Sequence, residues 1–152
     1  MNGKMFQLTS DDEIKITDYT GYDSLSHAVN GMIELVAEIE LPVRGLDEYG
    51  KFKNVNFDIY CNEEFLYMEG DEFNKANALT MAMIDHDLIR GNTVLIPIDT
   101  KTGANYGLSE DEADYVHKLL SSYKKEFKNK IKKIHTIKDN DRTCPEPQVF
   151  FD

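Results

Sequence analysis

Two adjacent carboxylates, Glu63 and Glu64, are the residues best placed for chemistry, because they follow Asn62 in a turn at the end of an apolar segment. Paired carboxylates can act as acid and base in catalysis, or they can bind the polar groups of a ligand. Like charges gathered in an exposed turn need no function, so binding is favoured over catalysis. We predict a ligand-binding site formed by Asn62, Glu63, Glu64, Asn74 and Arg90, and we assign no catalytic residue.

The densest group of metal-ligating side chains is the segment Asp85, His86 and Asp87. Carboxylate and imidazole groups suit divalent ions such as Mn, Zn or Fe. Three consecutive residues cannot all point at one ion, so a site would also need Asp99 or Glu112 from elsewhere. We interpret the segment as a solvated turn after a helix, with a small metal-dependent enzyme as the alternative. We expect neither a metal nor another cofactor.

The motifs of several common enzyme classes are absent from the sequence. Cys61 and Cys144 lie far apart, and neither belongs to a Cys-x-x-Cys pair that would indicate a zinc ribbon. No Gly-x-Ser-x-Gly segment and no glycine-rich loop ending in Lys-Ser or Lys-Thr occurs. These absences exclude the hydrolases, kinases and dinucleotide-binding proteins that depend on such motifs.

Alternation of apolar and polar residues, which is typical of half-buried strands, recurs along the chain. It predicts strands over 6–8, 14–16, 33–41 and 55–61, and a short strand over 65–68. Pro42 is expected to end the third of these strands. A continuous apolar run over 93–98 predicts a buried strand.

Apolar residues at helical spacing predict three helices. The first begins near Asp23 or Ser24 and stops at Asn30, and the second covers 71–83. The third begins at a capping box of Ser109 and Glu112, and its apolar face continues to residue 134. We therefore predict an α+β fold: a single domain over 1–138 with a mostly antiparallel sheet of about five strands, two short helices and one long C-terminal helix. Residues 139–152 are expected to form an extended polar tail.

Charge is distributed unevenly along the 152-residue chain, whose net charge is −11. Residues 1–114 hold 23 acids and 8 bases, whereas residues 115–152 hold 5 acids and 9 bases. An acidic body repels phosphate backbones, so nucleic-acid binding is disfavoured except through the lysine-rich C-terminal helix. We predict an interaction surface of Glu34, Glu38 and Glu40 on one face of a strand, together with Lys124, Lys128 and Lys132 on the last helix.

Two other roles remain open for this surface. The glutamate row could imitate the phosphates of DNA and inhibit a DNA-handling enzyme, or the apolar stripe of the last helix could form a homo-oligomer interface. No apolar run approaches the ~18–20 residues that a bilayer crossing requires. We therefore expect a cytoplasmic protein that makes no contact with a membrane.

Five short segments carry a family resemblance. Residues 24–36 run Ser-Leu-Ser-His-Ala-Val-Asn-Gly-Met-Ile-Glu-Leu-Val, and Cys-Asn-Glu-Glu at 61–64 is followed by Phe-Asn-Lys-Ala at 73–76. Further segments are Ile-Arg-Gly-Asn-Thr-Val-Leu-Ile at 89–96 and Leu-Ser-Glu-Asp-Glu at 108–112. In order and spacing, over 13–127, they resemble a family of small proteins of unknown function from phage, plasmid and bacterial genomes. Its members carry a Val-Gly-Gly-Tyr-Ile-Glu segment and a later Asn-Glu-Glu-Gly turn.

The resemblance implies a context rather than a chemistry. It points to a cytosolic accessory protein of a mobile element, and it carries over no catalytic residue. By analogy, we expect a non-enzymatic protein that binds a host protein or a small signalling ligand and so counters host defence.

Overall fold

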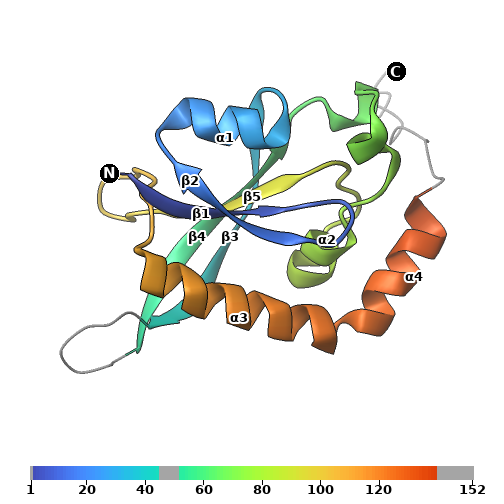
Figure 1. Ribbon diagram of the computed structural model, residues 1–152. Coiled ribbons are helices and arrows are strands. Elements are labelled where there is room, and N and C mark those ends of the chain that lie inside the picture. Colours follow the sequence, from blue (N-terminus) through green and yellow to red (C-terminus); the bar gives the residue numbers. More distant parts are fainter. Residues whose placement is uncertain (1, 45–51, 140–152) are drawn as a thin grey trace, which may run out of the picture.

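A computed structural model of the chain describes residues 2–44 and 52–139 (Figure 1). Five strands form one sheet in the order β2-β1-β5-β4-β3, and each neighbouring pair is antiparallel. The strands are β1 (Gly3–Leu8), β2 (Ile14–Tyr19), β3 (Ile33–Arg44), β4 (Phe52–Asn62) and β5 (Thr93–Pro97). The predicted α+β class and the five-stranded antiparallel sheet are confirmed.

Helices cover both faces of this sheet (Figure 1). Helix α1 (Tyr22–Val29) lies on one face, where its Leu25 and Val29 pack with Met5, Val94 and Ile96. The other face carries α2 (Ala78–Ile84), α3 (Glu110–Glu126) and α4 (Lys128–Lys138) over the larger part of the core. No described helix is both long and apolar enough to cross a bilayer.

Local signals set several boundaries correctly. Helix α1 ends at Asn30, which adopts the left-handed conformation (φ 58°) that terminates many helices. Helix α3 begins at Ser109, whose hydroxyl accepts a hydrogen bond from the Glu112 amide while the Glu112 carboxylate accepts one from the Ser109 amide. The predicted capping box is therefore confirmed.

The segment expected to hold a strand over 65–68 and a helix over 71–83 is built differently. It contains two short 3₁₀ helices, Phe65–Tyr67 and Asp71–Asn74, before α2 begins after Asn77. The buried Asn77 side chain accepts a hydrogen bond from the Thr80 amide and donates to the Leu8 and Gly91 carbonyls. These long-range bonds place the helix start at Asn77, so the apolar spacing that precedes it does not extend the helix.

Strand β3 continues through Pro42 to Arg44, beyond its predicted end. Pro42 pairs with Asn54 of β4. Proline lacks a donor, but β3 has only one neighbouring strand, and edge strands tolerate a residue that cannot donate to a second partner.

The predicted long C-terminal helix is divided into α3 and α4 at Phe127 (φ −92°, ψ 13°). The change of direction allows α4 to pack against α2 instead of extending past the sheet (Figure 1). Asp139, which we expected to open the tail, ends α4 and accepts a hydrogen bond from the Ala76 amide. The rest of the predicted tail, 140–152, lies outside the described residues.

Candidate functional site

The predicted ligand residue Asn62 is a structural link. Its side chain is buried, and its amide nitrogen donates to the carbonyls of Val29 and Asn30 at 3.0 and 3.1 Å. Its carbonyl oxygen accepts a hydrogen bond from the Glu64 amide at 2.7 Å. Asn62 thus ties the end of α1 to the turn after β4, while Glu63 and Glu64 are exposed beside it.

Arg90 lies elsewhere and has its own set of partners. Its buried guanidinium donates to the carbonyls of Asn74, Lys138 and Asp139 at 3.2, 2.7 and 3.2 Å. Free carbonyls at a helix C-terminus carry partial negative charge, so a buried arginine there satisfies several acceptors at once. The structure brings Asn74 and Arg90 together and gives Asn62 different partners.

His135 completes the attachment of α4. Its Nδ1 lies 2.8 Å from Asp139 Oδ1, and its Nε2 lies 2.9 Å from Asp12 Oδ2 in the turn between β1 and β2. Burial alone would lower the pKa of His135, but the hydrogen bonds and charges of Asp139 and Asp12 outweigh it, so the pKa is raised above its usual value. The pair of carboxylates therefore favours an imidazolium that holds α4 against the hairpin turn.

The weak metal candidates do not assemble into a site. Asp85 ends α2 in the left-handed conformation (φ 54°), and its carboxylate lies 3.6 Å from Lys130 Nζ. His86 and Asp87 are exposed beside it. Within 2–44 and 52–139, no three His, Cys, Asp or Glu side chains are grouped so that they could hold a metal ion.

The glutamate row expected on β3 is divided by a β-bulge. The register of β3 against β4 shifts between Leu35 and Ala37, so Glu34 pairs with Cys61 whereas Glu38 pairs with Asp58. Paired residues share a face, and an extra residue moves the following side chains to the opposite face. Glu34 therefore lies on the face of α2, and Glu38 and Glu40 lie on the face of α1. The expectation of one continuous acidic face is wrong.

Glu34 affects the thiol with which it pairs. Burial, followed by the charge of Glu34, raises the pKa of Cys61 to about 12. A thiol with so high a pKa is protonated at neutral pH and is a poor nucleophile. Cys61 is buried and free, and Cys144 lies outside the described residues.

Sequence reasoning missed a buried carboxylate next to the remaining glutamates. Asp58 of β4 is 1% exposed. Its Oδ2 accepts hydrogen bonds from the Tyr60 hydroxyl at 2.9 Å and from the Asn105 amide at 3.1 Å. Its Oδ1 is buried and has no hydrogen-bond partner in the part of the chain that the structure describes. Burial, followed by the hydrogen bond to Asp58, raises the pKa of Tyr60 to about 12, so this donor keeps its proton.

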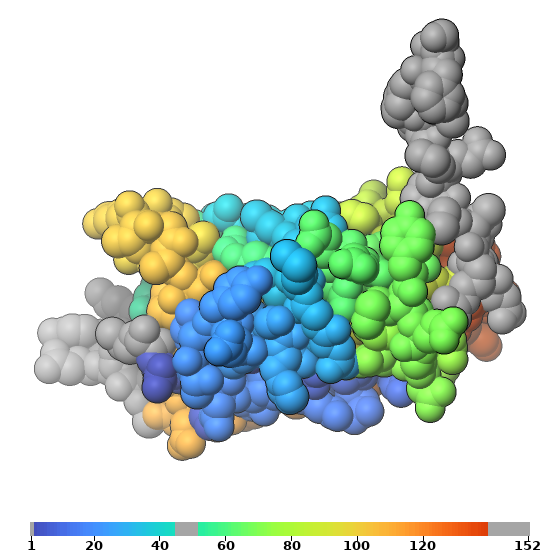
Figure 2. Space-filling model, turned by 90° about the horizontal axis from the view of Figure 1, so that it is seen from above, coloured from blue at the N-terminus to red at the C-terminus, as the bar shows by residue number. Residues whose placement is uncertain are grey.

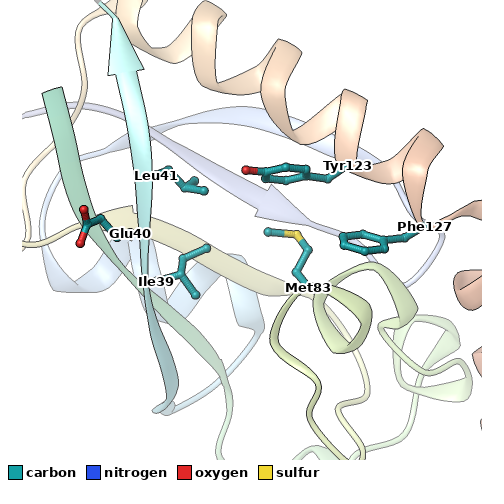
Figure 3. Close-up of a pocket in the computed structure, with 6 residues that line it drawn as sticks. All are labelled: Ile39, Glu40, Leu41, Met83, Tyr123 and Phe127. Carbon is teal, nitrogen blue, oxygen red and sulfur yellow. The ribbon is translucent and has the colours of Figure 1, made fainter. Parts of the chain in front are cut away.

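A hollow of about 210 Å³ lies beside β3, on the face of the sheet opposite to the one that carries the side chains of Glu38 and Glu40. Ile39 and Leu41 of β3 face Met83 of α2 and Tyr123 and Phe127 of the C-terminal region across it (Figure 3). The side chain of Glu40 points to the other side of β3 in this view. Pockets that enclose whole small ligands occupy about 300–1,000 Å³, so this hollow matches a side chain better than a free metabolite.

The outer edge of β3 is open. β3 is twelve residues long and pairs only with β4, and no backbone hydrogen bond among the described residues joins its other edge to another segment. Strands usually offer such an edge to another chain unless charges, bulges or proline restrict the pairing. β3 has all three of these restrictions: the glutamates, the bulge and Pro42. The outer edge of β3 therefore has no strand partner among the described residues, but it carries features that restrict which chains can pair with it.

A larger cleft of about 380 Å³ lies between α1 and the hairpin of β1 and β2. Figure 2 looks onto this face of the molecule, with α1 in blue and the yellow segment after β5 at one end. Four of the six polar residues that line the cleft already have partners: Gln7 donates to the Ala28 carbonyl, Ser24 to the Gly21 carbonyl and Asn30 to Glu72, and Asp18 pairs with Lys4. The buried hydroxyl of Thr17 has no hydrogen-bond partner among the described residues. A ligand site needs several polar groups free to converge on the ligand. The cleft is therefore a weaker candidate than β3.

The predicted basic surface is exposed. Lys124 lies in the last turn of α3, and Lys128 and Lys132 lie on α4. Because the chain changes direction at Phe127, these lysines are not arranged along one straight helix. Lys130 lies near the acidic body, where it contacts Asp85 and donates to the Ala82 carbonyl at 3.3 Å.

Comparison with protein-family models, curated proteins and solved structures found no match for this chain.

Proposed function

We propose that this chain is a non-enzymatic binding protein that engages a partner protein through β3 and the adjoining hollow. The observation that carries the proposal is the open edge of a long strand beside an apolar recess of side-chain size. An extended segment can pair with such an edge through main-chain hydrogen bonds while one of its side chains fills the recess.

The residues first considered for ligand chemistry favour this assignment. Asn62 and Arg90 have structural hydrogen bonds that fix α1 and α4, and Cys61 holds a protonated thiol in the core. None of the three is positioned to act on a substrate. By contrast, no backbone segment within 2–44 and 52–139 pairs with the outer edge of β3.

The biological context follows from the family resemblance. In this proposal the chain is an accessory protein of a mobile element, and its partner is a host protein that takes part in defence. A partner bound at one strand edge requires no catalytic group and no cofactor, so a small domain suffices for blocking.

A displayed library of random peptides selected against the immobilised chain tests the binding surface. Peptides that enrich are expected to slow hydrogen exchange at amides of β3 and to lose affinity when Met83→Gln makes the hollow more polar. Thermal unfolding of this variant checks that it remains folded. The proposal is overturned if no peptide enriches over a surface without the chain, or if the bound peptides protect α1 or α4 instead of β3.

A further inference from the structure

Strand β3 presents a different chemistry on each face, and this difference constrains what can pair with it. Ile39 and Leu41 face the hollow, whereas Glu38 and Glu40 lie on the α1 side. Side chains of a strand point alternately to the two faces of a sheet. A segment added at β3 would therefore place every second side chain beside the hollow and the others beside the glutamates.

On its α1 side, this edge carries negative charge that no described cation pairs with. Glu38 pairs across β3 and β4 with Asp58, and both side chains lie on one face. No lysine, arginine or histidine in the described part of the chain forms an ion pair with Glu38, Glu40 or Asp58. A buried carboxylate with an unsatisfied oxygen is costly unless a donor or a cation reaches it.

Charge also decides against a second copy of this chain as the occupant. Two β3 strands paired edge to edge would bring the carboxylates of Glu38 and Glu40 near those of the other copy. Like charges opposite each other destabilise a strand pair, whereas opposite charges stabilise it. The same carboxylates that oppose self-pairing favour a strand with lysine or arginine.

We propose that the partner segment is an extended basic stretch of another protein that joins β3 as a sixth strand, with basic and apolar residues alternating. Its basic side chains meet the exposed carboxylates of Glu38 and Glu40. Its intervening apolar side chains lie beside the hollow between Ile39, Met83 and Phe127. This inference rests on the proposed function, because it names the partner of the same surface.

The geometry supports the alternation rather than basic charge alone. Neighbouring strands lie about 4.8 Å apart, so side chains of the added strand stand directly beside those of β3 on each face. On the hollow side they meet apolar groups, where a buried lysine would lose its hydration. On the α1 side they meet exposed carboxylates, where an apolar side chain would bury little apolar surface and so add little to the binding free energy.

The test uses short fluorescein-labelled peptides and fluorescence anisotropy with the full chain. One peptide alternates lysine with valine, and a second has the same composition with all lysines in one block. A third replaces every lysine of the alternating peptide with glutamate. We expect the alternating basic peptide to bind more tightly than the block peptide, and the acidic peptide not to bind.

Variants of the chain assign the charge contacts. Glu38→Gln and Glu40→Gln are each expected to weaken the binding of the alternating peptide about 2- to 5-fold. Raised salt should reduce this difference in affinity between wild type and variant. Glu13→Gln, at an exposed glutamate in the turn between β1 and β2, is the matched control and should leave the affinity unchanged. Methylation of alternate peptide amides should abolish binding, because it removes main-chain donors to β3.

The outcomes separate this inference from the proposed function. If the block and alternating peptides bind equally, or if Glu38→Gln and Glu13→Gln have equal effects, the alternating basic partner is refuted. Library peptides that protect β3 but lack basic residues would also refute it while leaving the binding surface intact. If no peptide of any composition protects β3, both proposals fail.

Discussion

Replacing His135 with glutamine should destabilise the protein by an amount that depends on pH. The imidazole bridges Asp12 and Asp139, and these three side chains are only 21%, 21% and 23% exposed. A hydrogen bond that involves a charged group contributes about 1.5–3 kcal/mol. Glutamine can keep one of the two bonds, so we expect a loss of about 2 kcal/mol near pH 6 and a fall in Tm of about 4–8 °C.

The direction of the pH dependence follows from the raised pKa of His135. A raised pKa in the folded state means that the folded protein binds the proton more tightly than the unfolded chain does. The stabilisation is therefore complete below the unfolded pKa of about 6.5 and is lost as pH rises through the higher folded pKa. The difference in stability between wild type and variant should therefore be smaller near pH 9 than near pH 6.

Urea unfolding followed by circular dichroism at both pH values measures this difference, and an NMR titration of the His135 ring gives its pKa directly. His86→Gln is the matched control, because His86 is exposed and forms no ion pair in the described structure. A loss of stability equal at pH 6 and pH 9, or a His135 pKa at or below about 6.5, would refute the imidazolium bridge.

Two further predictions concern the core. The pKa of the Cys61 thiol is raised to about 12, so this thiol should react with a disulfide reagent only as fast as the protein unfolds. The reaction rate is measured from the absorbance of the thiolate that the reagent releases, in a variant whose other cysteine is replaced by serine. A rapid reaction of the folded protein would contradict the burial of this thiol. Gly107→Ala should cost more than about 2 kcal/mol in thermal unfolding, because a Cβ at Gly107 would overlap the backbone of Gly3. The exposed Ala104→Ser serves as its control, and equal small effects would contradict the close approach.

Much of the fold could be predicted because its signals are local. Asn30 ends α1 and Ser109 begins α3 through contacts within a few residues, so their sequences suffice to place them. The division at Phe127 depends instead on the packing of α4 against α2, and neither proline nor glycine marks it. The alternation of β3 is visible in the sequence, but the bulge beside Val36 is set by pairing with β4.

The candidate interaction surface could be predicted in part, because the exposed glutamates of β3 belong to a local alternating pattern. The sequence predicts Glu38 and Glu40 as interaction residues, and the structure leaves both exposed on the edge strand. Asp58 was overlooked because it occupies the polar position of an alternating strand, which in sequence indicates solvent exposure. Asn105, which lies far from Asp58 in the sequence, donates a hydrogen bond to the Asp58 carboxylate and helps to bury it. Arg90 is a predicted ligand residue, but its partners are the carbonyls of Asn74, Lys138 and Asp139, which no local sequence pattern reveals.

The position of β5 has a consequence for how the sheet is assembled. β5 lies between β1 and β4, although it is the last of the described strands in chain order. The hairpin of β1 with β2 and the hairpin of β3 with β4 are each local, and two-stranded hairpins are marginally stable alone. During synthesis the sheet cannot close until residues 93–97 have been made, so until then β1 and β4 each lack a neighbouring strand on one edge. The central strand therefore converts two independent hairpins into one cooperative unit in a single late step.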